Sequence, residues 1–265
     1  MQTLQEMPKM PSFQKSNYCH SYTDECSNYP QSEGSVDLSP EENITIRKAV
    51  TMDDMVKVFQ VRWEGYKKYY KSEDENVDES DLSPAATLLL AEDKHHNTVG
   101  TIRILDRRYG SIELDKFIDV DSFLSQEERV CIEATRFSIP KHLNSKLIKL
   151  LLWKSLFLYC QINHINTILM SARPAAARSY RCLFFENVGP AGVYSHSLLG
   201  NLEHQTYKCN IFERKYVIKK ENKPLYQFFF DKEHSNINTD YFKSYTQETE
   251  SLESLFYEKE DVTLI

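Results

Sequence analysis

The stretch CIEATRFSIP, residues 131–140, decides the fold. Its Ile, Ala, Thr and Phe residues predict a buried β-strand, yet two ionisable residues, Glu133 and Arg136, lie within it. A lone buried charge costs several kcal/mol, so buried charged groups are usually paired or face a polar cleft. The centre of the molecule is therefore expected to hold an ion-pair network or a polar cleft.

The spacing of Glu133 and Arg136 restricts the shape of this strand. On a regular strand, residues three apart point to opposite faces of the sheet. Either the two side chains serve different faces, or a β-bulge between them brings both to one cleft. We favour the bulge, because it also releases backbone N–H groups from the sheet.

The composition is that of a globular protein with room for one large core or two small ones. The chain has 265 residues, 41% of them hydrophobic, and no run approaches the roughly 20 apolar residues of a membrane span. The most apolar run, residues 147–160, includes Lys149 and Lys154 and predicts a core helix. We therefore expect no transmembrane segment.

Targeting and cysteine signals are weak. The first residues, MQTLQEMPKMPSF, lack the apolar centre of a secretory signal, and six cysteines are scattered without a CxxC pair. This pattern suits a reducing compartment better than a disulfide framework or a zinc site. We therefore expect a cytoplasmic protein with no metal site.

The net charge of −7 is distributed unevenly. Residues 1–42 hold seven acids and two bases, residues 235–265 hold the same numbers, and the remaining chain is therefore at +3. Within it, residues 135–220 carry thirteen Lys and Arg against three acids. This basic half predicts an anionic partner, with a merely solvated surface as the alternative. Nucleic acid is the least favoured partner, because no recognition helix is recognisable and the acidic ends would repel phosphate.

Composition and periodicity divide the chain into three regions. Residues 1–42, rich in Ser, Pro, Gln and Glu, predict a disordered N-terminal arm. Residues 43–234 predict a folded domain. Residues 235–265 predict an acidic, partly helical C-terminal tail.

The periodicity of the folded domain predicts strands and helices in a definite order. Thr51 can cap a helix over residues 52–70, with Asp53 and Asp54 in its first turn, and an acidic loop over residues 72–83 follows. Strands are expected in residues 43–50, 87–93, 97–105, 131–138, 165–172, 191–198 and 205–231, and further helices over residues 143–163 and 174–189.

This order of elements indicates a fold class. Strands that cluster early and then alternate with helices are typical of an α/β (α+β) domain, with a mixed sheet and helices on both faces. A TIM barrel or Rossmann fold would alternate more regularly, and the sequence has no GxGxxG motif.

Further polar residues interrupt the predicted helix, loop and strands. Arg62 lies on the inward face of the first helix, four residues before Tyr66. Asp78 and Asp81 lie in the acidic loop, and Arg103 interrupts the apolar strand GTIRIL. With the two ionisable residues of the opening stretch, they predict either a binding site or a purely structural network that links helix, loop and sheet.

The segments that carry these residues resemble a known enzyme family. VFQVRWEGY (58–66), VDESD (77–81), LLLAED (88–93), VGTIRIL (99–105) and EATRF (133–137) resemble the N-terminal half of the acyl-homoserine-lactone synthases. They resemble even more the long-chain N-acyl amino acid synthases, and both groups belong to the GNAT acyltransferase superfamily. The family's functional positions match Arg62, Tyr66, Asp78, Asp81, Arg103, Glu133 and Arg136.

Two departures favour the amino acid branch of this resemblance. The lactone synthases carry a tryptophan soon after the helix aromatic, where Tyr69 and Tyr70 are the nearest rings here. They usually have proline where Asp106 follows GTIRIL. The stretch SARPAAARSYRCLFFENVG (171–189) is also similar to the N-acyl amino acid synthases. The resemblance therefore implies an amino acid substrate rather than S-adenosylmethionine.

The resemblance implies a GNAT-like acyl-CoA N-acyltransferase fold over residues 43–234, with a mixed, mostly antiparallel central sheet. In such a sheet the strands corresponding to residues 131–138 and 165–172 separate, and the acyl thioester lies in the gap. Backbone N–H groups freed there can hold the thioester oxygen as negative charge develops, which is commonly worth about 3 kcal/mol.

The segment IPKHLNSK (139–146) indicates which acyl donor is used. Acetyl-CoA users place a glycine-rich loop here to bind the cofactor diphosphate, but this segment has no glycine, and Pro140 removes a backbone donor. We therefore expect an acyl-phosphopantetheine thioester on an acidic acyl carrier protein as the donor, with acyl-CoA as the alternative, and no tightly bound cofactor. Lys141, Lys146 and Lys149 are the candidate carrier-binding residues, with a solvated helix face as the alternative.

The resemblance also implies roles for the matched residues. Attack on a thioester requires a neutral amine, so Glu133 is the candidate general base, directly or through a water. Arg136 and Arg103 complete the candidate catalytic set, and a structural salt bridge of Glu133 with Arg103 or Arg62 is the alternative. The candidate substrate-binding residues are Arg62, Tyr66, Asp78, Asp81, Phe137 and Ser138, with an arginine gripping the carboxylate of the amino acid.

The sequence thus predicts an N-acyltransferase that moves a long-chain fatty acyl group from an acyl carrier protein to the α-amine of an amino acid. Two alternatives stay open. One is an autoinducer synthase that forms a lactone from S-adenosylmethionine, and the other is a non-catalytic GNAT-like binding module.

Overall fold

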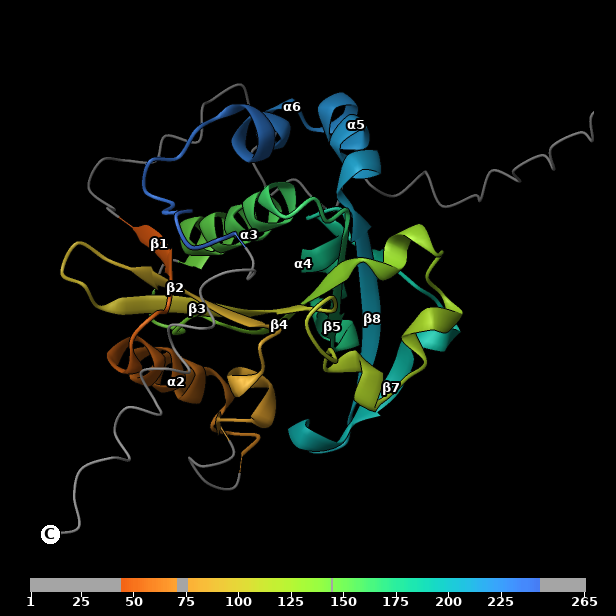
Figure 1. Cartoon of the computed structure of the whole chain (residues 1–265), viewed down its shortest axis with the longest axis horizontal. Coiled ribbons are helices and arrows are strands. Elements are labelled where there is room, and N and C mark those ends of the chain that lie inside the picture. Colours follow the sequence, from red (N-terminus) through yellow and green to blue (C-terminus); the bar gives the residue numbers. More distant parts are fainter. Residues whose placement is uncertain (1–43, 71–75, 144, 244–265) are drawn as a thin grey trace, which may run out of the picture.

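The computed structural model describes residues 44–70, 76–143 and 145–243. They form an eight-stranded, mostly antiparallel sheet in the order β1-β2-β3-β4-β5-β8-β6, with β7 also paired to β8 (Figure 1). The strands are β1 Thr45–Lys48, β2 Ala86–Glu92, β3 Thr98–Asp106, β4 Cys131–Ser138, β5 Thr167–Ala172, β6 Glu186–Asn187, β7 Val193–His196 and β8 Leu202–Asn210. The α-helices are α2 Met52–Tyr66, α3 Ser145–Ile162, α4 Ala177–Arg181, α5 Ile211–Glu221 and α6 Lys223–Tyr226.

Helices cover both faces of the sheet, as predicted. α3 lies against one face and α2 against the opposite face (Figure 1). The start of α2 is fixed by a capping box, because Thr51 Oγ1 accepts from the N–H of Asp54 at 3.1 Å while the N–H of Thr51 donates to Asp54 Oδ2 at 3.1 Å. This confirms the N-cap predicted from the sequence.

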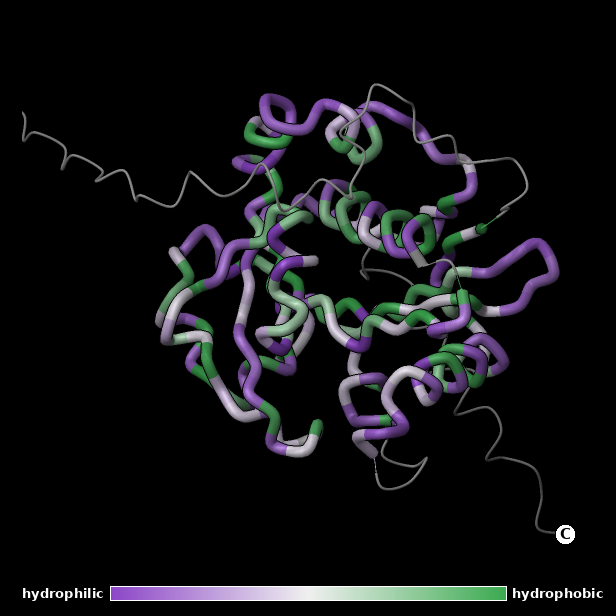
Figure 2. The backbone as a smooth tube through the Cα atoms, turned by 180° about the vertical axis from the view of Figure 1, so that it is seen from behind, coloured by the Kyte–Doolittle hydropathy of each residue, from purple (hydrophilic) through white to green (hydrophobic). Residues whose placement is uncertain are grey.

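The two faces of the sheet differ in chemistry. The face under α3 is apolar and packs Ile102, Ile104 and Ile132 against Leu151 and Trp153 of that helix. The run 147–160 is therefore the core helix expected from its composition. Figure 2 shows the hydrophobic residues concentrated on the central strands and α3, while the loop between β2 and β3 is hydrophilic. The opposite face carries Arg103 and Glu133, whereas Asp106 at the end of β3 lies on the α3 side and accepts from Tyr159 Oη at 3.3 Å.

The predicted β-bulge is present, and Arg136 belongs to it. The pairing of β3 with β4 runs from Arg103 opposite Thr135 to Thr101 opposite Ser138, so that one residue of β3 faces two residues of β4. Arg136 has a φ of 51°, which is rare for a residue with a side chain. The extra residue resets the alternation, so Thr135 and Arg136 both reach the charged face.

The predicted separation of two central strands is also present. β4 and β5 pair in parallel from Cys131 opposite Thr167 to Ala134 opposite Met170. Beyond Ala134, no pairing between these two strands occurs in the described part of the chain. The last four residues of β4 therefore diverge from β5, and this divergence positions the site described below.

The predicted helix over residues 174–189 is wrong. A turn of 3₁₀-helix, Pro174–Ala176, and the five residues of α4 replace it, and β6 follows. The helix ends because the Tyr180 carbonyl accepts from both Leu183 and Phe185, and Phe184 adopts a φ of 67°. Leu183, Phe184 and Phe185 are all buried, so this apolar run could not lie on one face of a helix.

The predicted strand over residues 205–231 is correct only as far as Asn210. The side chain of Asn210 accepts from the N–H of Glu213 and caps α5, and Asn222 caps α6 in the same way through Leu225. A turn of π-helix, Gln227–Asp231, completes this helical segment. The alternating apolar residues that suggested a strand are explained by helical faces packed on the core.

The segment after residue 234 packs on the folded domain. The N–H of Ile46 donates to the Asn236 carbonyl and the N–H of Asn238 donates to the Ile46 carbonyl, both at 2.8 Å. The side chain of Phe242 is fully buried. The predicted N-terminal arm and residues 244–265 of the predicted tail lie outside the described residues. Within the part that the structure describes, no helix has the length and hydrophobicity to cross a membrane.

Gly65 provides a test of how closely α2 approaches the diverging end of β4. A Cβ atom on Gly65 would lie 2.3 Å from Ser138 Oγ, whose hydroxyl donates to the Val61 carbonyl at 2.9 Å. Gly→Ala inside a helix normally stabilises by about 1 kcal/mol. Here we expect Gly65→Ala to lower the free energy of unfolding by about 1–3 kcal/mol through overpacking.

Urea denaturation measures this change in the free energy of unfolding. The loss should shrink in a Ser138→Ala background, because the clashing hydroxyl is then absent. A Gly65→Ala protein as stable as the wild type in both backgrounds would contradict the packing of α2 on β4.

Candidate functional site

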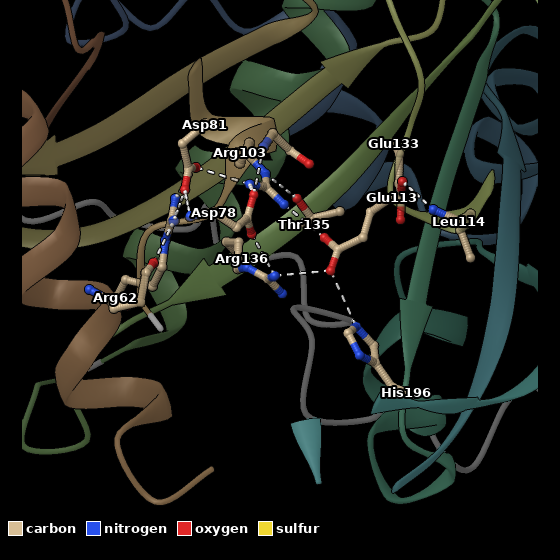
Figure 3. A network of polar contacts seen from close by, with 12 residues as sticks. Arg62, Asp78, Asp81, Arg103, Glu113, Leu114, Glu133, Thr135, Arg136 and His196 are labelled. Atoms are coloured by element: carbon tan, nitrogen blue, oxygen red, sulfur yellow. Dashed lines mark hydrogen bonds and ion pairs between the residues drawn. The ribbon is translucent and has the colours of Figure 1, made fainter. Parts of the chain in front are cut away.

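A buried network of three arginines and three carboxylates occupies the charged face of the sheet (Figure 3). Arg103 is at its centre. Its Nη1 atom lies 2.6 Å from Asp78 Oδ1 and 3.0 Å from Asp81 Oδ1, its Nη2 atom lies 2.7 Å from Glu113 Oε2, and its Nε–H donates to Thr135 Oγ1 at 2.8 Å. The Nε, Nη1 and Nη2 atoms of Arg103 therefore each have at least one acceptor.

The other two arginines bind the same carboxylates from either side. Arg62 forms a bidentate pair with Asp81, at 2.8 and 3.0 Å. Arg136 Nη2 bridges Asp78 Oδ2 at 2.7 Å and Glu113 Oε1 at 3.0 Å. Three positive and three negative charges cancel, which is how charged residues can occupy the interior of this sheet.

The acidic loop is folded locally so that both aspartates face the arginines. Asp78 caps the 3₁₀-helix Glu79–Leu82, since its side chain accepts from the N–H of Ser80 and its own N–H donates to Asp81. Asn76 anchors the loop to α2 by donating to the Phe59 carbonyl at 2.6 Å. The motif VDESD therefore serves as a folded cap over the arginines.

The charges of the network set the protonation of its acids. Burial alone would raise the pKa of Asp78, but Arg103 and Arg136 hold it well below its usual range. Burial would also raise the pKa of Glu113. The charge of Arg136, the contact with His196 and the charge of Arg103 outweigh it and lower the pKa of Glu113 to about 2. Both carboxylates are ionised at neutral pH.

Glu133 behaves in the opposite way. Burial and the nearby charge of Glu113 raise the pKa of Glu133 to about 8. Its Oε2 atom accepts from the N–H of Leu114 at 3.0 Å, so its carboxyl group holds the backbone beside Glu113 (Figure 3). Among the described residues, no ion pair joins Glu133 to Arg103 or Arg62.

A cavity of about 600 Å³ opens where β4 and β5 separate. Residues 134–141 form one wall and residues 171–173 the other. The end of α2, with Tyr66 and Tyr69, and the side chains of His196 and His204 close the remaining sides. The volume is within the range of about 300–1,000 Å³ that is usual for small-molecule sites.

The structure brings about half of the predicted site residues to this cavity. Those that line it are Tyr66, Arg136, Phe137, Ser138, Lys141 and Lys149. Those that do not are Arg62, Asp78, Asp81, Arg103, Glu133 and Lys146. The second set, apart from Lys146, lies in or beside the buried network. The roles predicted for all of these residues stay predictions.

Tyr66 and Ser138 fasten the diverging end of β4 to α2. Tyr66 Oη donates to the Phe137 carbonyl at 3.1 Å, and burial raises the pKa of Tyr66 to about 12. Ser138 Oγ donates to the Val61 carbonyl. On the other side, Phe137 stacks on Trp153 of α3, with ring centroids 5.9 Å apart. These contacts keep the cavity wall open.

Sequence reasoning missed several residues of the cavity wall, among them Glu113, Arg173, His196 and His204. Glu113 lies in an irregular segment between β3 and β4 where no periodicity marks it. His196 follows an alternating pattern in β7, whose Tyr194 and His196 side chains are buried, and this pattern was the available signal. A polar residue on the buried face of a short strand, such as His196 in β7, indicates a candidate site in the same way as Glu133 and Arg136 in β4.

The cavity carries an excess of positive charge. Lys68, Lys141, Lys149 and Arg173 line it together with Arg136, whereas Glu113 is the one carboxylate among its described lining residues. Burial lowers the pKa of Lys149, whose Nζ atom lies 5.8 Å from the Tyr180 ring centroid. The cavity is therefore suited to an anionic ligand. No group of three His, Cys, Asp or Glu in the described part of the chain is arranged to hold a metal ion.

A family model for the N-acyl amino acid synthase FeeM matches residues 58–199, which is more than half of the chain. The chain belongs to the FeeM family. The matched segment begins within α2 and includes β2 to β7, with most of the residues that line the cavity. The protein is therefore an acyltransferase, as the resemblance predicted.

Solved structures of other acyltransferases are similar to this chain at low sequence identity, and that of FeeM shows that the fold is shared. The structure of FeeM itself, an N-acyl amino acid synthase from uncultured soil microbes, superposes with a TM-score of 0.54 at 16% identity, over 66% of this chain and 94% of FeeM. An acyl-CoA N-acyltransferase from Pseudomonas aeruginosa has a TM-score of 0.46 at 17% identity, over 63% and 99% of the two chains. The acyl-homoserine-lactone synthase LasI has a TM-score of 0.47 at 16% identity, over 67% and 91%. No curated protein sequence matches the chain.

Glu133→Gln tests the neutral state of this buried carboxyl group. An unfolded glutamate has a pKa of about 4.3, and the folded-state pKa of Glu133 is raised to about 8. Folding therefore takes up a proton between these pH values. The stability that this proton provides is complete below the unfolded pKa and is lost as pH rises through the folded pKa, by about 1.4 kcal/mol per pH unit.

We expect Glu133→Gln to remove this contribution to the slope of the free energy of unfolding against pH, because glutamine does not titrate. The measurement is the free energy of unfolding in urea at several pH values between about 5 and 8. The same substitution at exposed Glu203 is the matched control. Equal slopes for the wild type and Glu133→Gln would show that Glu133 is ionised in the folded protein.

Proposed function

We propose that this protein transfers a long-chain fatty acyl group from an acyl carrier protein thioester to the α-amine of an amino acid. The observation that carries the proposal is the cationic cavity at the divergence of β4 and β5, in a chain of the FeeM family. The divergence provides a slot between two strands, and the family provides the class of reaction.

The segment after β4 favours a carrier protein over CoA as the donor. It contains no glycine, and Pro140 has no N–H to offer, so its sequence lacks the glycine-rich loop that binds a diphosphate in acetyl-CoA users. Lys141 and Lys149 line the cavity close to this segment. Two lysines suit the single phosphate of a phosphopantetheine arm and the acidic surface of a carrier.

The diverging end of β4 suits the reacting thioester. Residues 135–138 face the cavity without a partner strand on the β5 side. Backbone N–H groups at such an edge can donate to the thioester oxygen, and removing one donor of this kind typically costs about 3 kcal/mol of transition-state stabilisation. Tyr66 keeps this edge in place by donating to the carbonyl of Phe137.

Arg173 is the best candidate for binding the carboxylate of the amino acid. The three arginines of the buried network already use their guanidinium groups on Asp78, Asp81 and Glu113. Arg173 is exposed at the cavity, lies over the Tyr69 ring at 5.5 Å, and has no carboxylate within ion-pair distance among the described residues. A planar guanidinium held on an aromatic ring is well suited to bidentate binding of a carboxylate.

The reaction balances without a cofactor. The acceptor loses a proton from its ammonium group, and the lone pair of the nitrogen attacks the thioester carbonyl carbon to form the C–N bond. The carbonyl π electrons move to oxygen and return as the C–S bond breaks, and the nitrogen loses a second proton. The products are the N-acyl amino acid, the free thiol of the carrier arm and one proton.

The first test measures acyl transfer directly. The purified protein is incubated with acyl carrier thioesters of about C8 to C18 chain length and with each amino acid, and release of free thiol and mass of product are measured. We expect an N-acyl amino acid, with a higher kcat/KM for the carrier thioester than for the same acyl-CoA. A product that requires S-adenosylmethionine would instead support a lactone synthase, and no turnover with any donor would contradict the proposal.

Arg173→Met tests how the acceptor is recognised. A hydrogen bond to a charged group is worth about 1.5–3 kcal/mol, so we expect the KM for the amino acid to rise roughly 10- to 100-fold. A primary alkylamine, which has no carboxylate, should be acylated equally by the variant and the wild type. Arg129→Met, at an exposed arginine outside the cavity lining, is the matched control. An unchanged KM in Arg173→Met would assign carboxylate binding elsewhere.

A further inference from the structure

His196 and Glu113 form a pair at the wall of the cavity. His196 ends β7, is only 3% exposed, and its ring lines the cavity. Its Nε2 atom lies 3.3 Å from Glu113 Oε1 (Figure 3). The two residues come from separate parts of the chain, so the fold has brought a carboxylate and an imidazole together beside the separated strands.

The buried network holds Glu113 in a fixed orientation. Arg103 contacts its Oε2 atom at 2.7 Å, and Arg136 contacts its Oε1 atom at 3.0 Å. These cations keep the carboxylate ionised. A fixed carboxylate beside one ring nitrogen determines where the proton of a neutral imidazole resides, and here it favours the Nε2–H tautomer.

That tautomer leaves the lone pair on Nδ1. The Nδ1 atom is buried and has no hydrogen-bond partner among the described residues. A buried polar atom without a partner costs about 1–3 kcal/mol, so such atoms call for an explanation. An incoming group that donates a hydrogen bond to Nδ1 would remove this cost, and an ammonium or amine group is such a donor.

The other groups around His196 distinguish it from its neighbour His204. The His196 ring packs against Phe117, Tyr194 and His204, with centroids 4.7, 5.9 and 4.9 Å away. His204 has its Nδ1 atom 2.9 Å from the Leu202 carbonyl and no carboxylate within ion-pair distance in the described part. Burial, and to a smaller extent the charge of Arg173, lowers the pKa of His204.

We propose that His196, oriented by Glu113, is the general base that removes a proton from the α-ammonium group of the acceptor. The inference rests on the proposed function and deepens it. The proton passes from nitrogen to His196 Nδ1, and the freed lone pair attacks the thioester carbonyl carbon. Glu113 stabilises the imidazolium that results. As the C–S bond breaks, the imidazolium protonates the leaving thiolate and returns to its neutral form, and the nitrogen releases its second proton to water.

This assignment differs from the role predicted for Glu133. Glu133 does not line the cavity, its carboxyl group accepts from the Leu114 backbone, and its raised pKa keeps it protonated at neutral pH. A protonated carboxyl group has no lone pair basic enough for the task. His196 lies at the cavity, and its Nδ1 atom has no hydrogen-bond partner among the described residues, so geometry and chemistry both favour it.

The test compares His196→Gln with the wild type in single-turnover acyl transfer across about pH 5.5 to 9.5. The wild-type rate should rise with pH as the base loses its proton. His196→Gln should lose that rise and react at least about 100-fold more slowly at neutral pH, with little change in the KM for the carrier thioester. His95→Gln, at an exposed histidine in the loop between β2 and β3, is the matched control and should leave both properties unchanged.

Two further variants separate catalysis from structure. In His196→Ala, added imidazole should restore part of the rate, which would not happen if the residue were only structural. In Glu113→Gln, a variant of the positioning residue, the rising limb should move to lower pH, because the imidazolium loses its stabilising carboxylate. Circular dichroism checks that each variant is folded, and His196→Gln carries the test if Glu113→Gln is not.

The outcomes separate this inference from the proposed function. A wild-type protein that acylates no amino acid contradicts the proposed function, and the inference with it. A wild-type protein that does so, together with a His196→Gln variant that keeps both its rate and its pH profile, overturns the inference alone. Loss of the rising limb in His204→Gln rather than in His196→Gln would also overturn it.

Discussion

The burial of Arg103 in the middle of β3 is the constraint on which the rest of the site depends. A guanidinium inside a sheet must be surrounded by acceptors, and this one takes Asp78, Asp81, Glu113 and Thr135. Two of these acceptors lie in the acidic loop and one in the irregular segment before β4. Both segments must therefore fold over the sheet, and the position of Glu113 at the cavity wall follows from the charge of Arg103.

The charges of the buried network are matched within it, so the residues that stabilise the fold differ from those that are available to bind substrate. Arg62, Arg103 and Arg136 are matched by three carboxylates, so an anionic substrate gains little from the network as a whole. The cations that remain available, Lys141 and Arg173 among them, lie at the cavity. The guanidinium groups of the network are therefore already engaged by carboxylates, while Lys141 and Arg173 are better placed to meet an anionic substrate.

The sequence predicted this fold as far as local rules extend. Charges inside apolar strands predicted a buried polar centre, the spacing of Glu133 and Arg136 predicted a bulge, and Thr51 predicted the start of α2. The helical residues 211–231 and the partner of His196 could not be predicted in this way. Apolar residues in that segment fit a strand or a helix until the core position is known, and Glu113 meets His196 only through contacts between distant segments.

Glu113 and Glu133 lie at the same face of the sheet and differ in protonation, because they cannot both be ionised. The three arginines are already matched by three carboxylates, so a fourth negative charge close by would be buried without a partner. Glu113 contacts two arginines and keeps its charge, whereas Glu133 contacts a backbone N–H and retains its proton. The charged glutamate can orient an imidazole, and the neutral one can only hold the backbone. Glu133, the predicted general base, therefore contacts the backbone rather than an arginine, because the arginines leave ionic pairing for one of the two glutamates and not for both.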